Sequence, residues 1–292
     1  MSAELTEEQI KRALQGIRVP PQPQIMVDLQ MEQMMPEPDM RNIARLISQD
    51  PGLSGSLLKI VNSPFFGLSN RITSIQQAVN LLGIARVVNI VNAQSIRSQL
   101  SDDNILKLNR FWDNAQDVAA TCMTLAKQLG CTEPDEAYAL GLFHNCGIPL
   151  MFSRFDNYID VLETSYHSPG KRIVDVENLH LNTNHAVVGY FTAKSWLLPP
   201  HLCEAIANHH NARQLFIEDR CADIGLKNRL AILKMAEHIC RTHQILGGGE
   251  QDHEWEDTGD AILDYIGLTD YDFETLRDNC REMLSSGTGH QD

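Results

Sequence analysis

Apolar residues recur along most of this 292-residue chain at the three- and four-residue spacing of amphipathic α-helices. No segment alternates convincingly with the two-residue period of a half-buried strand. We therefore predict an all-α fold. In the N-terminal half, the apolar faces of the expected helices are formed by Met40, Ile43, Leu46 and Ile47; by Leu53, Leu57, Leu58 and Val61; by Ile75, Val79 and Leu82; and by Val87, Val88 and Val91.

Residues with strong preferences for helix ends mark where several of these helices start and stop. Asp50 followed by Pro51 predicts an N-terminal cap and a first-turn proline, and Asn62-Ser63-Pro64 predicts the end of that helix. Gly83 predicts a break between the next two helices.

A long helix is expected in the second half, around residues 111 to 129, and Gly130 should end it. The following helix opens at Glu133-Pro134-Asp135 and reaches His144. Further helical windows cover residues 156–166, 185–197, 200–209 and 226–245, and a pair of helices ends the chain.

Prolines and polar turns divide the chain into four expected parts. The prolines of RVPPQPQ, residues 18 to 24, favour an extended boundary after a short first helix, and SDDN, residues 101 to 104, favours a turn. The acidic, glycine-bearing segment 247–260 is typical of a linker or surface loop. We expect an N-terminal helix (1–18), an N-terminal helical subdomain (19–104), a helical core (105–246), and an acidic linker with C-terminal helices (247–292).

The charge balance disfavours two classes of partner. The chain has 24 basic and 38 acidic residues, a formal net charge of −14, which repels the phosphates of nucleic acids and anionic lipids. No apolar run approaches the roughly 20 residues that cross a bilayer, and the first residues resemble an acidic amphipathic helix rather than a signal peptide. The seven cysteines are odd in number and never form a CxxC pair. These features predict a cytoplasmic protein with reduced thiols that binds neither nucleic acid nor membrane.

Histidines are concentrated in the second half of the chain, where nine of the eleven fall between residues 144 and 243. Four of them, His144, His185, His209 and His210, lie on or at the ends of expected helices among apolar neighbours. Such positions can converge inside a helical bundle, and three histidines suffice to hold zinc. Carboxylates that would orient a nucleophilic water are scarce beside these histidines, which argues against hydrolysis.

The chain resembles the HDOD family, an HD-related group of bacterial signalling proteins, over roughly residues 19 to 245. The resemblance is carried by landmarks that occur in the family's order. They are Pro20 and Pro21; Asp50-Pro51 with Leu57 and Leu58; Asn62-Ser63; Ile75, Ala78, Leu82 and Gly83; His144-Asn145 with Gly147; Glu177; His185 and Gly189; Trp196, Leu198 and Pro199; and His209-His210.

This resemblance implies an HD-like helical bundle with an N-terminal helical subdomain, and a regulatory role in signal transduction more often than catalysis. It also implies a metal site formed by His144, His185, His209, His210 and Glu237. That site departs from the catalytic pattern in two places: Asn114 stands where catalytic relatives have a histidine, and Asn145 stands where they have an aspartate. An asparagine offers a metal one neutral oxygen in place of an anion.

Other departures from the cyclic-dinucleotide phosphodiesterases of the HD class concern the residues around the histidine pairs. Ile148 replaces a lysine, no GYP tripeptide follows His209-His210, and Glu237 stands where the resemblance places an aspartate. We therefore expect no catalytic residue and no organic cofactor. If the site holds a metal, a divalent transition ion such as zinc, iron or manganese suits its imidazole ligands.

Three functions remain as hypotheses. The first is a non-catalytic signalling module whose surfaces bind other signalling proteins, for which Phe65, Phe66 and Leu68 form either a contact patch or part of the core. The second is a metal-dependent phosphohydrolase acting on a nucleotide or cyclic dinucleotide. The third is DNA binding through a helix-turn-helix outline at residues 75–91, although only Arg86 and Arg97 bring positive charge to its second helix. We prefer the first; the sequence leaves the oligomeric state and the input signal open.

Overall fold

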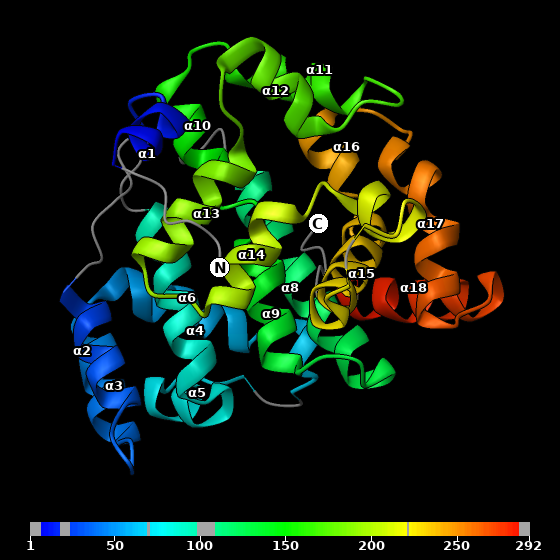
Figure 1. The fold of residues 1–292 in the computed structure, drawn as a ribbon. Coiled ribbons are helices and arrows are strands. Elements are labelled where there is room, and N and C mark those ends of the chain that lie inside the picture. The colour runs from blue at the N-terminus through cyan, green and yellow to red at the C-terminus, as the bar shows by residue number, and fades with distance from the viewer. Residues whose placement is uncertain (1–6, 18–23, 69–70, 98–108, 221, 286–292) are drawn as a thin grey trace, which may run out of the picture.

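The computed structural model describes residues 7–17, 24–68, 71–97, 109–220 and 222–285, and all regular elements in these ranges are helices (Figure 1). The prediction of an all-α fold is confirmed. The turn predicted at residues 101–104 lies outside the described residues. The N-terminal helices are α1 (Glu7–Leu14), α2 (Gln24–Gln33), α3 (Met40–Ser48), α4 (Pro51–Val61), the 3₁₀ turn η1 (Pro64–Phe66), α5 (Ile75–Leu82) and α6 (Ile84–Arg97).

The remaining elements form the larger part of the molecule. They are α8 (Asn109–Leu129), α9 (Pro134–Phe143), α10 (Ile148–Arg154), α11 (Tyr158–Tyr166), α12 (Ile173–Leu181), α13 (His185–Ser195), α14 (Pro200–Asn208), the π-helical turn η2 (Arg213–Ile217), α15 (Ile224–Ile239), α16 (Thr242–Gly247), α17 (His253–Ile266) and α18 (Asp270–Ser285). No helix among the described residues is long and apolar enough to cross a membrane.

Local hydrogen bonds explain where the N-terminal helices begin and end. The Asp50 carboxylate accepts a hydrogen bond from the backbone N–H of Leu53 at 3.1 Å, so Asp50 caps α4 as predicted. Asn62 ends that helix because its amide donates to the carbonyl of Leu58 and its oxygen accepts from the backbone of Ile72. The apolar faces of α2 to α6 then meet in one cluster, which includes Met26, Ile43, Leu57, Val79 and Val87.

The helix-turn-helix hypothesis fails on the second of its two helices. The structure has α5, a break at Gly83 and then α6, as the sequence predicts. However, Val87, Val88 and Val91 of α6 are buried in the N-terminal cluster. Side chains that read DNA bases must be free to enter a groove, so this helix serves packing.

The central core is built on the pair α8 and α9. These helices approach closely because Gly141 of α9 has no side chain: a Cβ there would lie 2.7 Å from the Cα of Ala119 on α8. Helices α14 and α15 complete the cluster, to which α17 and α18 add Ile262, Phe273 and Cys280. The proposed domain boundaries stay predictions, but the two last helices pack into this core.

Two predicted segments are wrong in detail. The helix predicted at residues 226–245 is interrupted after α15, since Arg241 adopts a left-handed conformation with φ of 55°, and α16 starts at Thr242. The segment 247–260, predicted as a linker, is helical from His253 onward because the Asp252 side chain caps α17 by accepting from the N–H of Trp255.

The sequence patterns also missed three helices, α2, α10 and α12. Helix α2 has no single apolar face: Met26 and Leu29 are buried in the cluster, whereas Met31 is 64% exposed. Since helical periodicity is a signal of one-sided burial, a helix that is apolar on two sides escapes it.

The aromatic loop of residues 65–68 is part of the packing between subdomains. Phe65 packs on the central core and Phe66 on the N-terminal cluster, with the two rings in an edge-to-face contact. Both rings are half-buried, whereas Leu68 is exposed. The core-packing interpretation therefore fits the two phenylalanines better than an exposed contact patch.

The turn between α9 and α10 lies against the first turn of α13. A Cβ at Gly147 would lie 2.0 Å from the carbonyl oxygen of His185, a distance that no side chain permits. Because residue 147 is glycine, the segment that carries His144 and Asn145 can approach the residue that begins α13. This contact positions the candidate site.

Candidate functional site

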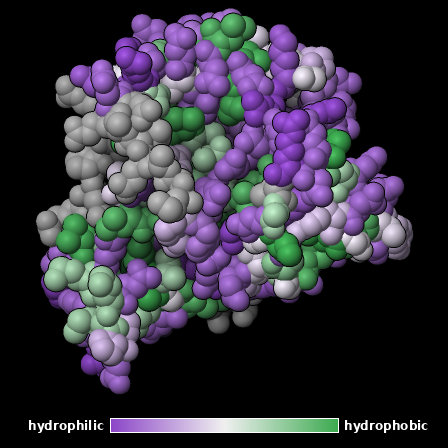
Figure 2. Space-filling model, in the orientation of Figure 1, coloured by the Kyte–Doolittle hydropathy of each residue, from purple (hydrophilic) through white to green (hydrophobic). Residues whose placement is uncertain are grey.

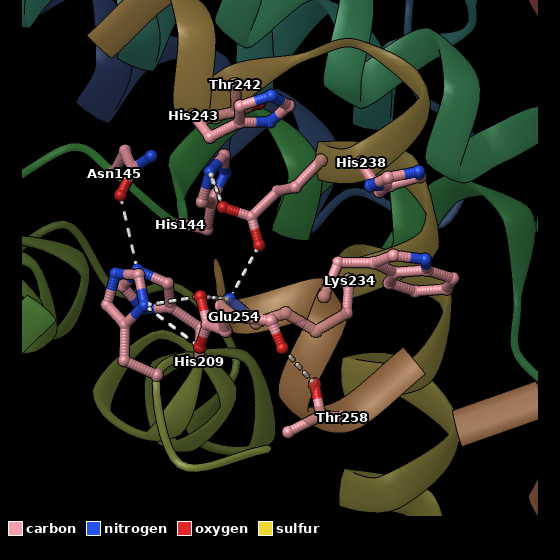
Figure 3. Close-up of polar contacts among 12 residues, drawn as sticks. His144, Asn145, His209, Lys234, His238, Thr242, His243, Glu254 and Thr258 are labelled. Carbon is pink, nitrogen blue, oxygen red and sulfur yellow. Dashed lines mark hydrogen bonds and ion pairs between the residues drawn. The ribbon is translucent and has the colours of Figure 1, made fainter. Parts of the chain in front are cut away.

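The four histidines singled out in the sequence lie together in the larger part of the molecule. Figure 3 shows two of them, His144 and His209, with Asn145 beside them. His144 and Asn145 follow α9, His185 is the first residue of α13, and His209 and His210 follow α14. All four imidazoles and the Asn145 amide are buried. The structure thus brings these side chains together.

Each of these imidazoles is held by an acceptor at its Nδ1 atom. The Nδ1 atoms of His144 and His209 lie 2.8 and 2.6 Å from the backbone carbonyl oxygens of Gly141 and Ile206. Since a carbonyl oxygen can only accept, both nitrogens must carry the proton. His185 and His210 are held in the same way by carboxylates, at 2.7 Å from Glu177 and 3.1 Å from Glu254.

With the protons on Nδ1, the Nε2 atoms present lone pairs to one another. The Nε2 atom of His185 lies 3.1 Å from the Nε2 atoms of both His209 and His210. Where these nitrogens are unprotonated, their facing lone pairs repel, and a cation held between the three nitrogens would relieve that repulsion.

The three imidazoles fit a transition-metal ion. Their ligand atoms all lie within 4.8 Å of one another. A tetrahedral zinc ion with Zn–N bonds of about 2.0–2.1 Å places neighbouring nitrogens about 3.3 Å apart, close to the observed spacing. The Asn145 oxygen lies close to this group, 3.2 Å from the Nε2 atom of His209. We call this group of three imidazoles the three-histidine centre.

Glu177 positions the ring of His185. One of its oxygens accepts from both the backbone N–H and Nδ1 of His185, and the other accepts from the Tyr158 hydroxyl at 2.7 Å. The carboxylate is fully buried. Such a partner fixes the ring orientation and makes Nε2 a stronger ligand. Glu177 therefore acts on the centre through His185.

Burial favours the neutral form of His209 and His210. It lowers the pKa of His209 well below its ordinary value, and the neighbouring His210 and His185 lower it further. The pKa of His210 is lowered in the same way, by burial and then by the ammonium of Lys234. A metal binds only deprotonated imidazole nitrogens, so these shifts favour binding at neutral pH.

His144 and Glu237 lie beside the three-histidine centre and form a separate pair. The Nε2 atom of His144 faces a carboxylate oxygen of Glu237 at 3.3 Å, without the alignment of a hydrogen bond. The other oxygen of Glu237 forms a 2.7 Å ion pair with Lys234, which also pairs with Glu254 at 3.0 Å. Burial alone would raise the pKa of Glu237, but the charge of Lys234 holds it below its ordinary value.

Asn114 contributes to packing and lies outside this network. Its side-chain oxygen accepts from the hydroxyl of Thr242 at 3.1 Å, and its amide nitrogen lies 3.4 Å from the carbonyl of Cys240. The residue thus joins α8 to the turn between α15 and α16.

Two charged residues of the site were not predicted, Lys234 and Glu254. Lys234 stands on a helix with apolar residues on most sides, and Glu254 stands in the segment taken for a linker. The Asp252 cap holds Glu254 in place, because Asp252 binds both the first turn of α17 and the Nδ1 atom of His238, at 2.9 Å. A capping aspartate before two glutamates was the available signal for this helix start.

The chain matches one family model and two uncharacterised curated proteins. The model of the HDOD domain family matches residues 19–212. A protein of Treponema pallidum (strain Nichols) is 27% identical over 201 residues, and YuxH of Bacillus subtilis (strain 168) is 30% identical over 112 residues. These matches cover 66% and 37% of the chain, but only 38% and 26% of the two relatives, which are therefore much longer.

Solved structures share the fold at low identity. An HDOD domain protein of unknown function from Geobacter sulfurreducens has a TM-score of 0.68 at 20% identity, covering 97% of this chain and 98% of that one. A protein from Shewanella amazonensis SB2B, provisionally named a phosphohydrolase, has a TM-score of 0.65 at 23% identity, covering 94% and 95%. A protein from Marinobacter aquaeolei VT8, provisionally named a signal transduction protein, has a TM-score of 0.65 at 19% identity, covering 94% and 58%. The HD-like helical fold is thereby confirmed.

The neutral histidines predict a pH dependence of stability. The folded-state pKa values of His209 and His210 lie below the value of 6.5 expected for the unfolded chain. Below pH 6.5 the unfolded state therefore binds more protons than the folded state, and the free energy of unfolding falls as the pH falls. Between pH 6.5 and 5 each histidine contributes a loss of at most about 2 kcal/mol.

Urea unfolding of the metal-free protein in chelator, at several pH values from 8 to 5, measures this effect. The matched variant His209→Gln should lose stability less steeply over the same range, because it has one fewer titrating imidazole while the carboxylates are unchanged. Identical pH profiles for the two proteins would contradict the assignment of a neutral, buried His209.

Proposed function

This chain belongs to the HDOD family, and from that premise we propose that it is a non-catalytic signal-transduction module that acts through contacts with other proteins. The three-histidine centre then has a structural role: a metal ion held there would join α13 to the end of α14. The proposal rests on the space around the centre and on the charges that face it.

The size of the cavities at the site is the observation that carries the proposal. One cavity, lined by Lys234, Glu237 and Glu254, measures about 20 Å³, and another, lined by His210 and Glu254, measures about 70 Å³. The first is large enough for a single water molecule, whereas pockets for small-molecule substrates measure roughly 300–1,000 Å³. Neither cavity admits a nucleotide.

The carboxylates near the centre are already bound. Glu177 is used by His185 and Tyr158, Glu254 by His210 and Lys234, and Glu237 by Lys234 and His144. Hydrolysis at a metal centre needs a group that orients or deprotonates the attacking water. Asn145, the polar side chain that approaches the three-histidine centre, is an amide and cannot take a proton.

The alternative is a metal-dependent phosphohydrolase acting on a nucleotide or cyclic dinucleotide. It is favoured by the convergence of the three imidazoles, which is a ligand arrangement used by catalytic as well as structural metal ions. It requires the cavities to widen enough to admit the substrate, and it requires the neutral Asn145 to replace an anionic ligand.

A hydrolysis assay separates the two functions. The protein, loaded in turn with Zn²⁺, Mn²⁺ and Fe²⁺, should release no phosphate or nucleotide from bis(p-nitrophenyl) phosphate, nucleotides or cyclic dinucleotides above the level of the variant His185→Asn. We expect turnover below roughly 10⁻³ s⁻¹, against typical enzymatic values of 1–10³ s⁻¹. Release that disappears in both His185→Asn and His144→Ala would establish the phosphohydrolase instead.

An exposed methionine face supports the role of protein contacts. Met31 and Met34 are 64% and 85% exposed, and Val27, one turn before Met31, lies on the same side of α2. Met35 extends the face beyond the end of the helix at 56% exposure. The pale green area over α2 at the lower left of Figure 2 corresponds to it. Exposed methionines suit interfaces because their flexible side chains adapt to different partners.

Replacing this face should reduce partner binding without unfolding the protein. The triple variant Met31→Ser, Met34→Ser, Met35→Ser removes apolar surface but no buried side chain, so its melting temperature should stay within a few degrees of that of the unaltered protein. In affinity purification from the cells that produce the chain, the triple variant should retain less than about a tenth of each specific partner, as expected for loss of a central contact. The control Leu179→Ser removes an equally exposed apolar residue of α12 and should retain all of it. Equal capture by both variants would contradict the assignment of this face.

A further inference from the structure

Lys234 is a buried cation within the ligand-rich cavity beside the three-histidine centre. Its side chain is 4% exposed, and its Nζ atom lies 2.7 Å from Glu237 and 3.0 Å from Glu254. The two carboxylates come from different helices, α15 and α17, and both contact the ammonium. Burial by itself would lower the pKa of Lys234, but these two carboxylates raise it above its ordinary value.

The groups around Lys234 are those that would bind a divalent cation. His144 directs its Nε2 atom into this part of the cavity, and that atom is buried and has no hydrogen-bond partner. Glu237 faces the same nitrogen at 3.3 Å, and Glu254 reaches the ammonium from the opposite helix. An imidazole and two carboxylates form a suitable donor set for a transition-metal ion. Lys234 thus contacts side chains that a metal ion could use as ligands.

The charges that line the cavity favour a single metal ion. The carboxylates of Glu237, Asp252 and Glu254 face it, and Lys234 is the cation that pairs with Glu237 and Glu254. A second divalent ion next to that ammonium would place two positive charges side by side in a buried site, which is strongly unfavourable. Removing the charge of Lys234 removes this repulsion and leaves the carboxylates free to bind an ion.

We infer that Lys234 is a built-in cation that occupies the place of a second metal ion, so that the protein binds one divalent ion, at His185, His209 and His210. This inference deepens the proposed non-catalytic function, on which it rests. Two metal ions about 3.5–4 Å apart can together activate the nucleophile and stabilise the leaving group. An ammonium cannot replace the second ion in that chemistry, because it has no vacant orbital to bind the oxygens.

Metal stoichiometry tests the inference directly. The unaltered protein and the variant Lys234→Met are stripped with chelator, equilibrated with Mn²⁺ or Zn²⁺ by dialysis, and analysed for metal by mass spectrometry. We expect one equivalent in the unaltered protein and two in Lys234→Met, which keeps the length of the side chain but removes its charge. In thermal unfolding, added metal should stabilise the variant more than the unaltered protein.

The control is Lys227→Met, which makes the same substitution on the same helix. Lys227 pairs with Asp219 and lies against the ring of Tyr265, outside the cavity. This variant should bind one equivalent, as the unaltered protein does. If Lys234→Met does not fold without metal, it is refolded with excess Mn²⁺: recovery of folded protein with two ions supports the inference, and failure to recover overturns it.

Two further results would overturn the inference. They are a second ion bound by the unaltered protein, and a folded Lys234→Met that binds no more metal than the unaltered protein. These outcomes are distinct from failure of the proposed function. Hydrolysis by the unaltered protein with one bound ion would contradict the non-catalytic role and leave the role of Lys234 intact. Two bound ions without hydrolysis would contradict the role of Lys234 and leave the non-catalytic role intact.

Discussion

Each of the four buried imidazoles binds an acceptor through Nδ1, and the rest of the site depends on this one constraint. The acceptors are two backbone carbonyls and two carboxylates, and together they direct four Nε2 lone pairs into a region closed to solvent. Unpaired polar atoms in such surroundings are costly. Three of them meet at His185, whose Nε2 atom lies 3.1 Å from those of His209 and His210, and a cation held between them would stabilise them. The orientation of the rings, more than the number of histidines, makes this cluster suited to hold a cation.

The same buried surroundings leave room for an ion but not for a substrate. Cavities of about 20 and 70 Å³ adjoin the site, and each nearby carboxylate is engaged with an imidazole or with Lys234. Helix α13 connects the site to the distant methionine face. It begins with His185 and ends at Ser195, and the carbonyl oxygen of the next residue, Trp196, lies 3.4 Å from the amide nitrogen of Gln30 on α2. The three-histidine centre and the proposed partner surface are thus joined by one helix.

The sequence predicted those features that depend on neighbouring residues in the chain. The α4 cap at Asp50, the breaks at Asn62 and Gly83, and the start of α13 at His185 follow from local preferences. The left-handed Arg241 and the two-sided helix α2 have no such signal.

Lys234 and Glu254 were missed for another reason: a charged residue becomes part of a site only through tertiary contacts between α15, α17 and the histidine segments. Asn114, predicted to replace a ligand, instead accepts a hydrogen bond from Thr242.

The most direct test of the central claim is nuclear magnetic resonance of the histidine side chains, with one-bond and long-range correlations between hydrogen and nitrogen recorded before and after one equivalent of Zn²⁺. Our account predicts protons on the Nδ1 atoms of His144, His185, His209 and His210 in both states. Zinc should shift the Nε2 resonances of His185, His209 and His210 and leave that of His144 in place. A proton on Nε2 of any of the three after zinc is added, or spectra that zinc does not change, would contradict it.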